Sequence, residues 1–439
     1  MNHRYGIKRG MAWCAAAAML AGSLTGCGSD SSSANRQLGA QEAAFTPSLD
    51  TDAEISLDIA GFMGNFEALD QVVNNFNEYY PNVTITYNQN GPDLLREYLE
   101  NNAFTDIFMT DETNVRYADW GDQYVGDLCL DLSQEDIDLS AVRDEMIEDC
   151  KIDGSLVRVP LAMNTYGIVV NRTLLENEGL KIPENFAQFE EVCEALKDKG
   201  YTPIQGSSNH LYAELFDNMT FNMIGHDTEL AAELNDGNPQ HLDKLRLVFE
   251  RMDELIEKGY TDREVNDTYP ADNYDEAILK FFEGDVPFWV CSAECVSGMK
   301  KRESKSETFS AHPFEYQFMY APVGDDGSFE YQQPWYGFSV NKDSDNLDYA
   351  VEFIRFLTTE DQLNTMANVK GMPSVAKQSE DERYDAIYNP QHVQESFLND
   401  GTVHVGVTKN WNDIFNMFGS GQYDGIDGGM QAMTERLTW

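Results

Sequence analysis

Positively charged residues are scarce in this sequence. Over 439 residues, 30 Lys and Arg stand against 76 Asp and Glu, which gives a formal net charge of −46. A field of this sign repels phosphate backbones and anionic lipid surfaces, so it excludes nucleic-acid binding and disfavours an anionic small ligand. Two interpretations of the acidity stay open: a solvated surface that resists aggregation, or a field that attracts a cationic solute.

Long apolar runs are absent, with one short exception at the N-terminus. Arg4, Lys8 and Arg9 precede an apolar stretch at 11–22, which is shorter than the roughly 20 residues needed to span a bilayer. A basic start followed by a short apolar run is typical of a secretory signal. The sequence therefore predicts a protein that stands outside the cell and has no other segment able to cross a membrane.

The end of this segment, Leu24-Thr25-Gly26-Cys27, resembles the lipobox of bacterial lipoproteins. The resemblance implies that 1–27 is a lipoprotein signal peptide and that the Cys27 thiol carries a diacylglycerol, whose two acyl chains anchor far more firmly than one. An ordinary signal peptide with an incidental cysteine is the alternative. Residues 28–53 are rich in Ser, Ala and Gln, and we expect them to form a flexible tether.

Cysteine is infrequent, with seven residues in the chain. Beyond Cys14 and Cys27 five remain, and an odd number outside the cell leaves at least one thiol free. Cys291 and Cys295 have neither zinc-finger spacing nor nearby histidines, so no metal site is expected there. Burial as a small apolar side chain is the default expectation for all five, and their disulfide state stays open: Cys129, Cys150, Cys193, Cys291 and Cys295.

The familiar catalytic motifs are missing too. The sequence contains no phosphate-binding Walker loop, no GxSxG elbow and no HExxH helix, and its seven histidines are scattered. Residues 343–346 begin like a calcium loop but lack its glycine and terminal glutamate. We therefore expect no catalysis, cofactor or metal, although carboxylates are too abundant for counting alone to exclude a glycosidase pair.

The apolar residues that are present follow an alternating order of strands and helices. Strands are expected at 55–59, 83–87 and 106–109, with a helix at 66–80 between the first two, and a further strand at 166–170. This rhythm predicts an α/β architecture with a largely parallel sheet. A chain of this length is too long for one core, and two α/β lobes fit it better than a single sheet.

A series of segments resembles the bacterial extracellular solute-binding proteins of family 1, a sugar-binding group, in the order typical of that family. The resemblance covers residues 54–439 and rests on the segments 55–65, 106–108, 126–132, 159–161, 167–175, 179–186, 200–204, 281–285, 321–323, 336–342, 350–357 and 371–374. It implies a type II periplasmic-binding-protein-like fold, in which two α/β lobes are joined by a hinge that the chain crosses several times.

The family resemblance also implies boundaries and partners. Lobe 1 is expected to comprise 54–162 and 337–380, and lobe 2 to comprise 163–336 and 381–439, with crossings near 162–164, 336–341 and 376–385. The implied protein is a monomeric, lipid-anchored binding subunit on the outer face of the cell membrane. It would capture a carbohydrate between its lobes, without altering it, and deliver it to an ABC permease.

A sugar offers flat C–H faces and a rim of hydroxyls, so its site needs aromatic platforms and planar polar side chains. We expect Trp335 and Tyr336, at a loop entering a strand, and Trp411, at the start of a helix, to line such a site. The alternative for both tryptophans is core packing. The further candidates lie in loops and at strand ends: Phe62, Asn65, Asp111, Glu112, Asn164, Tyr166, Ser292 and Glu294.

Two other functions remain in view. The strong negative charge favours a polyamine or another cationic solute as the ligand. A secreted glycoside hydrolase is a third reading, in a different class of protein. Glu294 stands where the family often has a tryptophan, which casts doubt on a maltose-like specificity.

Overall fold

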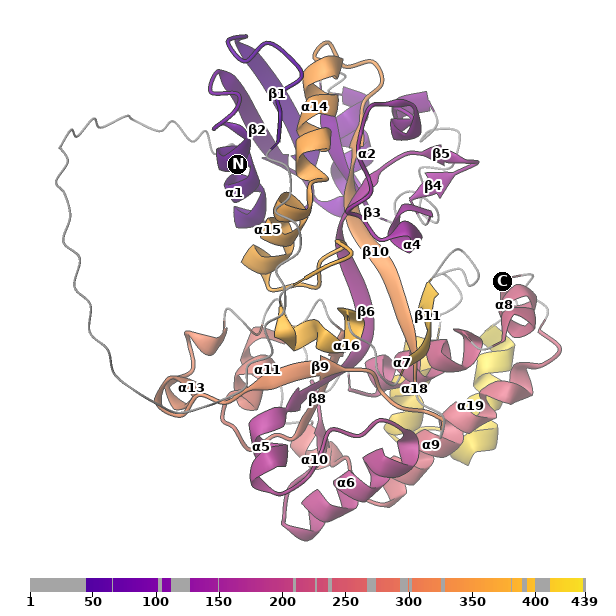
Figure 1. Cartoon of the computed structure of the whole chain (residues 1–439). Coiled ribbons are helices and arrows are strands. Elements are labelled where there is room, and N and C mark those ends of the chain that lie inside the picture. The colour runs from indigo at the N-terminus through magenta and orange to yellow at the C-terminus, as the bar shows by residue number, and fades with distance from the viewer. Residues whose placement is uncertain are drawn as a thin grey trace, which may run out of the picture. The chain divides into compact units, whose positions relative to one another are not determined.

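The structure is a computed structural model (Figure 1). It describes residues 45–64, 66–101, 105–111, 127–148, 150–207, 211–225, 227–235, 239–266, 274–292, 299, 302–324, 328–379, 381–388, 393–398 and 411–436. The signal peptide, Cys27 and the first part of the expected tether therefore lie outside the described residues.

Eleven strands are assigned within these residues. They are β1 (Ile55–Gly61), β2 (Val83–Gln89), β3 (Ile107–Asp111), β4 (Lys151–Ile152), β5 (Ser155–Leu156), β6 (Val159–Asn171), β7 (Ile204–Gln205), β8 (Phe288–Ser292), β9 (Tyr316–Met319), β10 (Ser328–Val340) and β11 (Val393–Leu398). The strands expected at 55–59, 83–87 and 106–109 are confirmed as β1 to β3. The strand expected at 166–170 is the second half of the longer β6.

The helices that accompany the first strands are α1 (Glu67–Phe76), α2 (Pro92–Asn101), α4 (Asp144–Glu148), α14 (Leu347–Leu357) and α15 (Glu360–Lys370). The remaining helices are α5 (Arg172–Asn177), α6 (Phe186–Asp198), α7 (Leu211–Gly225), α8 (Thr228–Asn235), α9 (Arg246–Glu257), α10 (Arg263–Asn266), α11 (Tyr274–Phe281), α13 (Glu307–Ala311), α16 (Asp385–Tyr388), α18 (Asn412–Gly419) and α19 (Gly425–Arg436). Short 3₁₀ turns are η2 (Leu132–Gln134), η3 (Leu242–Leu245) and η4 (Glu382–Tyr384).

The sheet is mixed rather than largely parallel. Its order is β2-β1-β3-β10-β6-β8-β7, with β11 beside β10 and β9 beside β6. Strands β2, β1 and β3 are parallel, as are β7 and β8, which agrees with the α/β rhythm. The long strands β10 and β6 pair antiparallel with each other, β10 pairs antiparallel with β3, and β6 pairs antiparallel with β8. The sheet is mixed because this antiparallel pair lies between the two groups of parallel strands.

Separate apolar cores lie at the two ends of β6. The first core forms between β1 to β3 and the helices α1, α14 and α15, and it includes Val159 and Leu161 of β6. The second core forms around α6, α7, α9 and α18, and it includes Ile168 and Val170 from the far end of the same strand. Since one strand supplies buried residues to both cores, the chain changes core within β6.

Burial in the two cores follows the helical periodicity of the sequence. On α1 the buried residues are Ala68, Leu69, Val72 and Phe76. Acidic residues in its first turn interact favourably with the positive end of the helix dipole. This helix ends at Phe76, four residues before the expected end. No helix among the described residues has the length and apolar character to cross a bilayer.

Three of the cysteines are buried and form no disulfide, in agreement with the default expectation of burial: Cys129, Cys150 and Cys193. Burial raises the pKa of the Cys129 thiol to about 12, so the thiolate does not form at neutral pH. The side chain of Cys291 and all of Cys295 lie outside what the structure describes.

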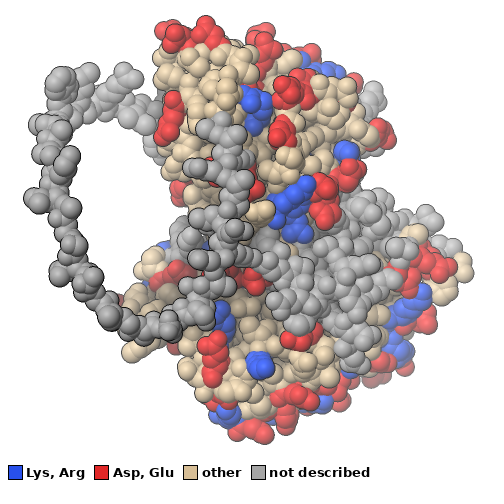
Figure 2. All heavy atoms as spheres, viewed as in Figure 1, with Lys and Arg blue, Asp and Glu red and all other residues tan. Residues whose placement is uncertain are grey.

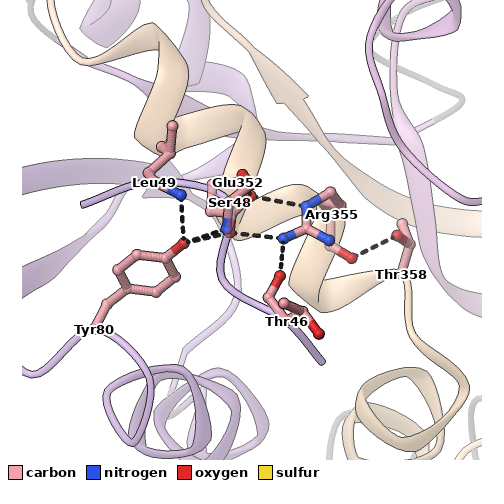
Figure 3. A network of polar contacts seen from close by, with 7 residues as sticks. All are labelled: Thr46, Ser48, Leu49, Tyr80, Glu352, Arg355 and Thr358. Carbon is pink, nitrogen blue, oxygen red and sulfur yellow. Dashed lines mark hydrogen bonds and ion pairs between the residues drawn. The ribbon is translucent and has the colours of Figure 1, made fainter. Parts of the chain in front are cut away.

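Residues 45–50, which the tether prediction included, pack on the folded structure. They lie against α14 and the turn after α1, where Glu352 accepts hydrogen bonds from the Ser48 amide (3.0 Å) and the Ser48 hydroxyl (2.7 Å) (Figure 3). Arg355 donates to the Thr46 carbonyl at 2.7 Å. The expectation of a flexible tether up to residue 53 was therefore wrong for its last residues, because a buried carboxylate and an arginine hold their main chain.

Glu352 makes this attachment sensitive to acid. Burial opposes its ionisation, but hydrogen bonds from Arg355, Ser48 and Tyr80 outweigh burial and lower its pKa to about 2. A carboxylate with a lowered folded-state pKa contributes stability above its unfolded pKa, and that stability is lost as the pH falls through the folded value.

We expect Glu352→Gln to lower the free energy of unfolding at pH 7 by up to about 3 kcal/mol. The difference from the wild type should shrink between pH 4.5 and pH 2. Urea unfolding across this range measures it. Glu100→Gln, in an exposed ion pair with Arg96, is the control and should change stability by less than about 0.5 kcal/mol. A deficit for Glu352→Gln that is the same at pH 2.5 and pH 7 would contradict the linkage.

Candidate functional site

An aromatic surface forms where the carboxyl ends of β1, β2 and β3 meet the crossing strand β10. Phe62 directly follows β1, and its ring lies edge-on to that of Tyr336 in β10, with centroids 6.5 Å apart. The ring of Trp335 lies 4.8 Å from Tyr336. In an α/β sheet, ligands bind at the carboxyl ends of parallel strands, so these aromatic residues occupy the expected position for a site.

These aromatic side chains differ in their exposure to solvent. Phe62 and Trp335 are only partly buried, whereas Tyr336 is 1 % exposed and packs in the first core. Tyr336 also contacts the buried ring of Phe66 at 6.0 Å. We therefore assign Phe62 and Trp335 as surfaces able to contact a ligand, and Tyr336 as the support beneath them. Trp335 lies within strand β10, not in the loop expected before it.

Strand register brings further predicted residues to this edge. Tyr336 pairs with Asp111 at the end of β3 on one side and with Ala162 of β6 on the other. Two residues along β6, Asn164 pairs with Gln333, and Tyr166 pairs with Ser292 of β8. Backbone pairing thus connects five of the predicted residues across four adjacent strands: Asp111, Tyr336, Asn164, Tyr166 and Ser292.

Three of the predicted residues lie outside the described residues: Asn65, Glu112 and Glu294. For Asp111, Asn164, Tyr166 and Ser292 only the backbone is described, so their contribution as side chains stays a prediction.

Trp411 does not lie with this surface. It is fully buried in the second core, and its ring lies 6.4 Å from that of Phe415. The physical reason is the apolar face of α18, where Ile414, Phe415 and Phe418 pack among the residues of α7 and α9. Trp411 immediately precedes this helix and is buried with it. The structure thus presents Trp411 as a core residue, which was the alternative to a ligand platform.

Tyr87 is a residue that the sequence reasoning missed. It lies near the end of β2 and is partly buried, its hydroxyl donates to the Met63 carbonyl at 3.0 Å, and its ring lies 5.6 Å from Phe66. Burial raises its pKa, so it stays a neutral donor. A side chain at Gly61 would meet the Tyr87 hydroxyl at 2.6 Å, so the glycine is needed for Tyr87 to lie over the strand end. The sequence offered one signal for this residue, because Tyr87 is an aromatic residue at the end of the strand expected at 83–87.

A glycine also fixes the position of Tyr336. A Cβ atom on Gly337 would lie 2.2 Å from the Val159 carbonyl oxygen of β6, which no real structure tolerates. The register of β10 on β6 shifts on either side of Tyr336. Gly337 therefore lets the two crossing strands approach closely at the residue that supports the aromatic surface.

One group of potential metal ligands occurs among the described residues. Ligand atoms of Glu229, Glu233 and His241 lie within 4.8 Å of one another. The carboxylate of Glu233 is already engaged in hydrogen bonds: it accepts from the Gln240 and His241 amides and lies 2.6 Å from the His241 ring nitrogen Nδ1. This arrangement holds the turn after α8, and it involves none of the predicted site residues.

Comparison with known proteins identifies the family. A family model described as bacterial extracellular solute-binding protein matches residues 62–363, more than half of the chain. The chain belongs to this family. Its members are solute-binding proteins rather than enzymes and work outside the cytoplasm. The resemblance drawn from the sequence is therefore confirmed, and so is the two-lobed type II fold of mixed helices and strands.

Solved structures of solute-binding proteins share this fold at low sequence identity. A sugar transporter protein from Bacillus licheniformis, in complex with stachyose, has a TM-score of 0.62 and 17 % identity over 87 % of this chain and 98 % of its own. A family 1 solute-binding protein from Bifidobacterium longum subsp. infantis gives 0.65 and 16 % over 87 % and 98 %.

A third solved structure binds a different sugar. The cyclic α-maltosyl-1,6-maltose binding protein from Arthrobacter globiformis gives a TM-score of 0.61 and 16 % identity, and the match covers 88 % of this chain and 100 % of that one. A search of curated proteins finds no match.

We expect Gly337→Ala to destabilise the protein by about 1–3 kcal/mol, because the added methyl group forces β10 away from β6. Urea unfolding measures the change. Gly91→Ala is the matched control, since nothing lies within 4 Å of the position its Cβ would take, and it should alter stability by less than about 0.5 kcal/mol. Equal effects of the two substitutions would show that the close approach does not constrain the strands.

Proposed function

We propose that this solute-binding protein captures a carbohydrate, in the size range of an oligosaccharide, and delivers it to an ABC permease. The observation that carries the proposal is the aromatic surface of Phe62 and Trp335, supported by Tyr336, at the carboxyl edge of the first group of strands. Relatives of the same fold are solved with stachyose or named for binding a cyclic maltosyl-maltose, which supports the same ligand class.

The chemistry of the surface suits a sugar. The C–H face of a pyranose ring is apolar and flat, and it packs on an exposed aromatic ring while its hydroxyls reach polar groups at the edge. Trp335 and Phe62 supply partly exposed rings. Strand pairing puts the backbone of Asp111 directly beside that of Tyr336, and we propose the carboxylate of Asp111 as an acceptor for sugar hydroxyls.

Closure of two lobes would complete the site. We propose that residues 54–162 and 337–380 form lobe 1, and that 163–336 and 381–439 form lobe 2. Strands β6 and β10 contribute residues to both lobes, and they support a hinge of this kind because β6 supplies buried side chains to both cores and β10 pairs with it. The ligand would lie between the lobes, against the aromatic surface.

Location and partners complete the proposal. The basic start, short apolar run and Leu24-Thr25-Gly26-Cys27 support a lipid on Cys27 that holds the protein at the outer face of the cell membrane. A permease in that membrane would receive the ligand from the closed form. We propose that the protein acts as a monomer.

A cationic ligand such as a polyamine is the second candidate. The chain carries a formal net charge of −46, and Asp and Glu outnumber Lys and Arg on the face shown in Figure 2. Exposed aromatic rings also bind cations over their faces. The two ligand classes predict different responses to the same measurement.

We expect raffinose-type and maltose-type oligosaccharides to raise the melting temperature of the protein, and spermidine not to do so. A ligand at a hundredfold excess over its Kd adds about 2.7 kcal/mol to the stability of the folded state. Thermal-shift assays against a carbohydrate library measure the effect. Stabilisation by spermidine alone would favour the cationic ligand, and release of reducing sugar would indicate a hydrolase.

Trp335→Ala should weaken binding of the sugar identified in this way by at least about tenfold, equivalent to about 1.4 kcal/mol, because it removes a ring that packs on the ligand. Isothermal titration calorimetry gives the Kd. Leu94→Ala is the control, since Leu94 on α2 is 58 % exposed and contributes to no part of the proposed site. Unchanged affinity for Trp335→Ala would remove Trp335 from the site.

A further inference from the structure

Residues 45–50 are held by a set of side chains that bind their main chain at successive positions (Figure 3). Arg355 donates to the Thr46 carbonyl at 2.7 Å, Glu352 accepts from the Ser48 amide, and the Tyr80 hydroxyl accepts from the Ser48 and Leu49 amides at 3.1 and 3.2 Å. Tyr349 donates to the Asp50 carbonyl at 2.9 Å. We call residues 45–50 the clasp segment.

Glu352 is the centre of this arrangement. It is 2 % exposed and accepts hydrogen bonds from Tyr80, Arg355 and both polar groups of Ser48. A buried carboxylate is costly unless its oxygens are satisfied, so removing any of these partners leaves charge unpaired. The clasp segment supplies two of the partners, which couples it to α14.

Apolar packing holds the first residue of the segment. The Phe45 ring lies edge-on to Phe356 at 4.9 Å and to Tyr79 at 5.3 Å, and the Arg355 guanidinium lies 4.3 Å over its face. Phe356 belongs to the first core. Phe45 is therefore fixed both by ring contacts and by a cation–π contact.

None of these bonds serves the sheet or the aromatic surface. The clasp segment precedes β1, which begins at Ile55, and its partners lie on α14 and in the turn that follows α1. The contacts instead connect residues 45–50 to a helix and a turn that pack on the first core. A pull from the N-terminal side would thus load α14 and the turn after α1 rather than the start of β1.

We infer that the clasp segment is the attachment point through which the membrane connection is fixed to the first lobe. The inference rests on the proposed lipid at Cys27. The stretch between Cys27 and the clasp segment comprises residues 28–44, and 17 residues span at most about 60 Å at roughly 3.5 Å per residue. Opening the clasp would add residues 45–53 and lengthen that reach by about 30 Å.

Limited proteolysis of the purified full chain tests the clasp. Chymotrypsin cuts after aromatic and leucine residues, so Phe45 and Leu49 report on the segment itself. We expect fragments that begin at Thr46 or Asp50 to appear at least tenfold faster for Glu352→Gln and for Arg355→Ala than for the wild type. Mass spectrometry of the fragments identifies each cut. Equal rates for wild type and variants would overturn the inference.

Two further variants distinguish opening of the clasp segment from general unfolding of the protein. Tyr80→Phe removes only the hydroxyl that accepts from Ser48 and Leu49 and donates to Glu352, and it should speed the same cuts to a smaller degree. Arg96→Ala removes an exposed ion pair with Glu100 on α2 and should leave the rates unchanged. Sugar-induced stabilisation should persist in all four variants, because none of these residues belongs to the proposed site.

The membrane part of the inference has a separate readout. With the lipidated protein bound to vesicles of phosphatidylglycerol and phosphatidylethanolamine, released body that begins at Thr46 or Asp50 should accumulate at least tenfold faster for Glu352→Gln than for the wild type. Cutting after Leu38 also releases the body, so mass spectrometry of the new N-terminus separates the two routes. Equal rates for the fragments that begin at Thr46 or Asp50 would overturn the attachment point. A chain that never binds the vesicles would instead refute the lipid at Cys27, while the cuts in solution would still report on the clasp.

Discussion

The close antiparallel pairing of β6 and β10 is the interaction on which the rest of this structure depends. Each strand has 13 residues, and β6 supplies buried side chains to two separate cores. The absence of a side chain at Gly337 allows the main chains to approach at the position where Tyr336 supports the aromatic surface. This pair of strands thus runs between the two halves and positions the aromatic surface, which links movement between the halves to the place where we propose that a ligand lies.

The aromatic surface shows how residues with little specific signal in the sequence come together as a candidate site. Phe62, Trp335 and Tyr336 come from segments far apart in the sequence, and they meet only because β10 runs antiparallel beside β3. The same pairing brings the main chain of Asp111 beside Tyr336. Partial exposure of two rings above a buried third gives a rigid apolar face. Such a face would discriminate among ligands by shape and would need no reactive group, in agreement with a family of binding proteins.

Local sequence patterns predicted the elements of this fold better than their arrangement. Strands β1 to β3 follow from alternating apolar residues, whereas the antiparallel course of β10 does not, because pairing across more than 200 residues leaves no local signal. Trp335 and Trp411 show the same limit for the site. Trp335 lies within β10 and is partly exposed, whereas Trp411 directly precedes α18 and is buried. This difference arises because α18 packs on α7 and α9, and the local sequence does not reveal it. The clasp was missed because its main chain is held by distant side chains, while its own composition is that of a linker.

The buried thiols carry a consequence for where this protein can operate. Cys129, Cys150 and Cys193 are buried and form no disulfides, so none of them acts as a cross-link, and burial keeps Cys129 and Cys193 in the unreactive protonated form. Cohesion around these positions comes from packing and hydrogen bonds, such as the one that Arg158 donates to Cys150. Swings between oxidising and reducing surroundings should therefore leave this part of the molecule unaltered, an advantage for a protein that works beyond the reach of the cell's own thiol buffers.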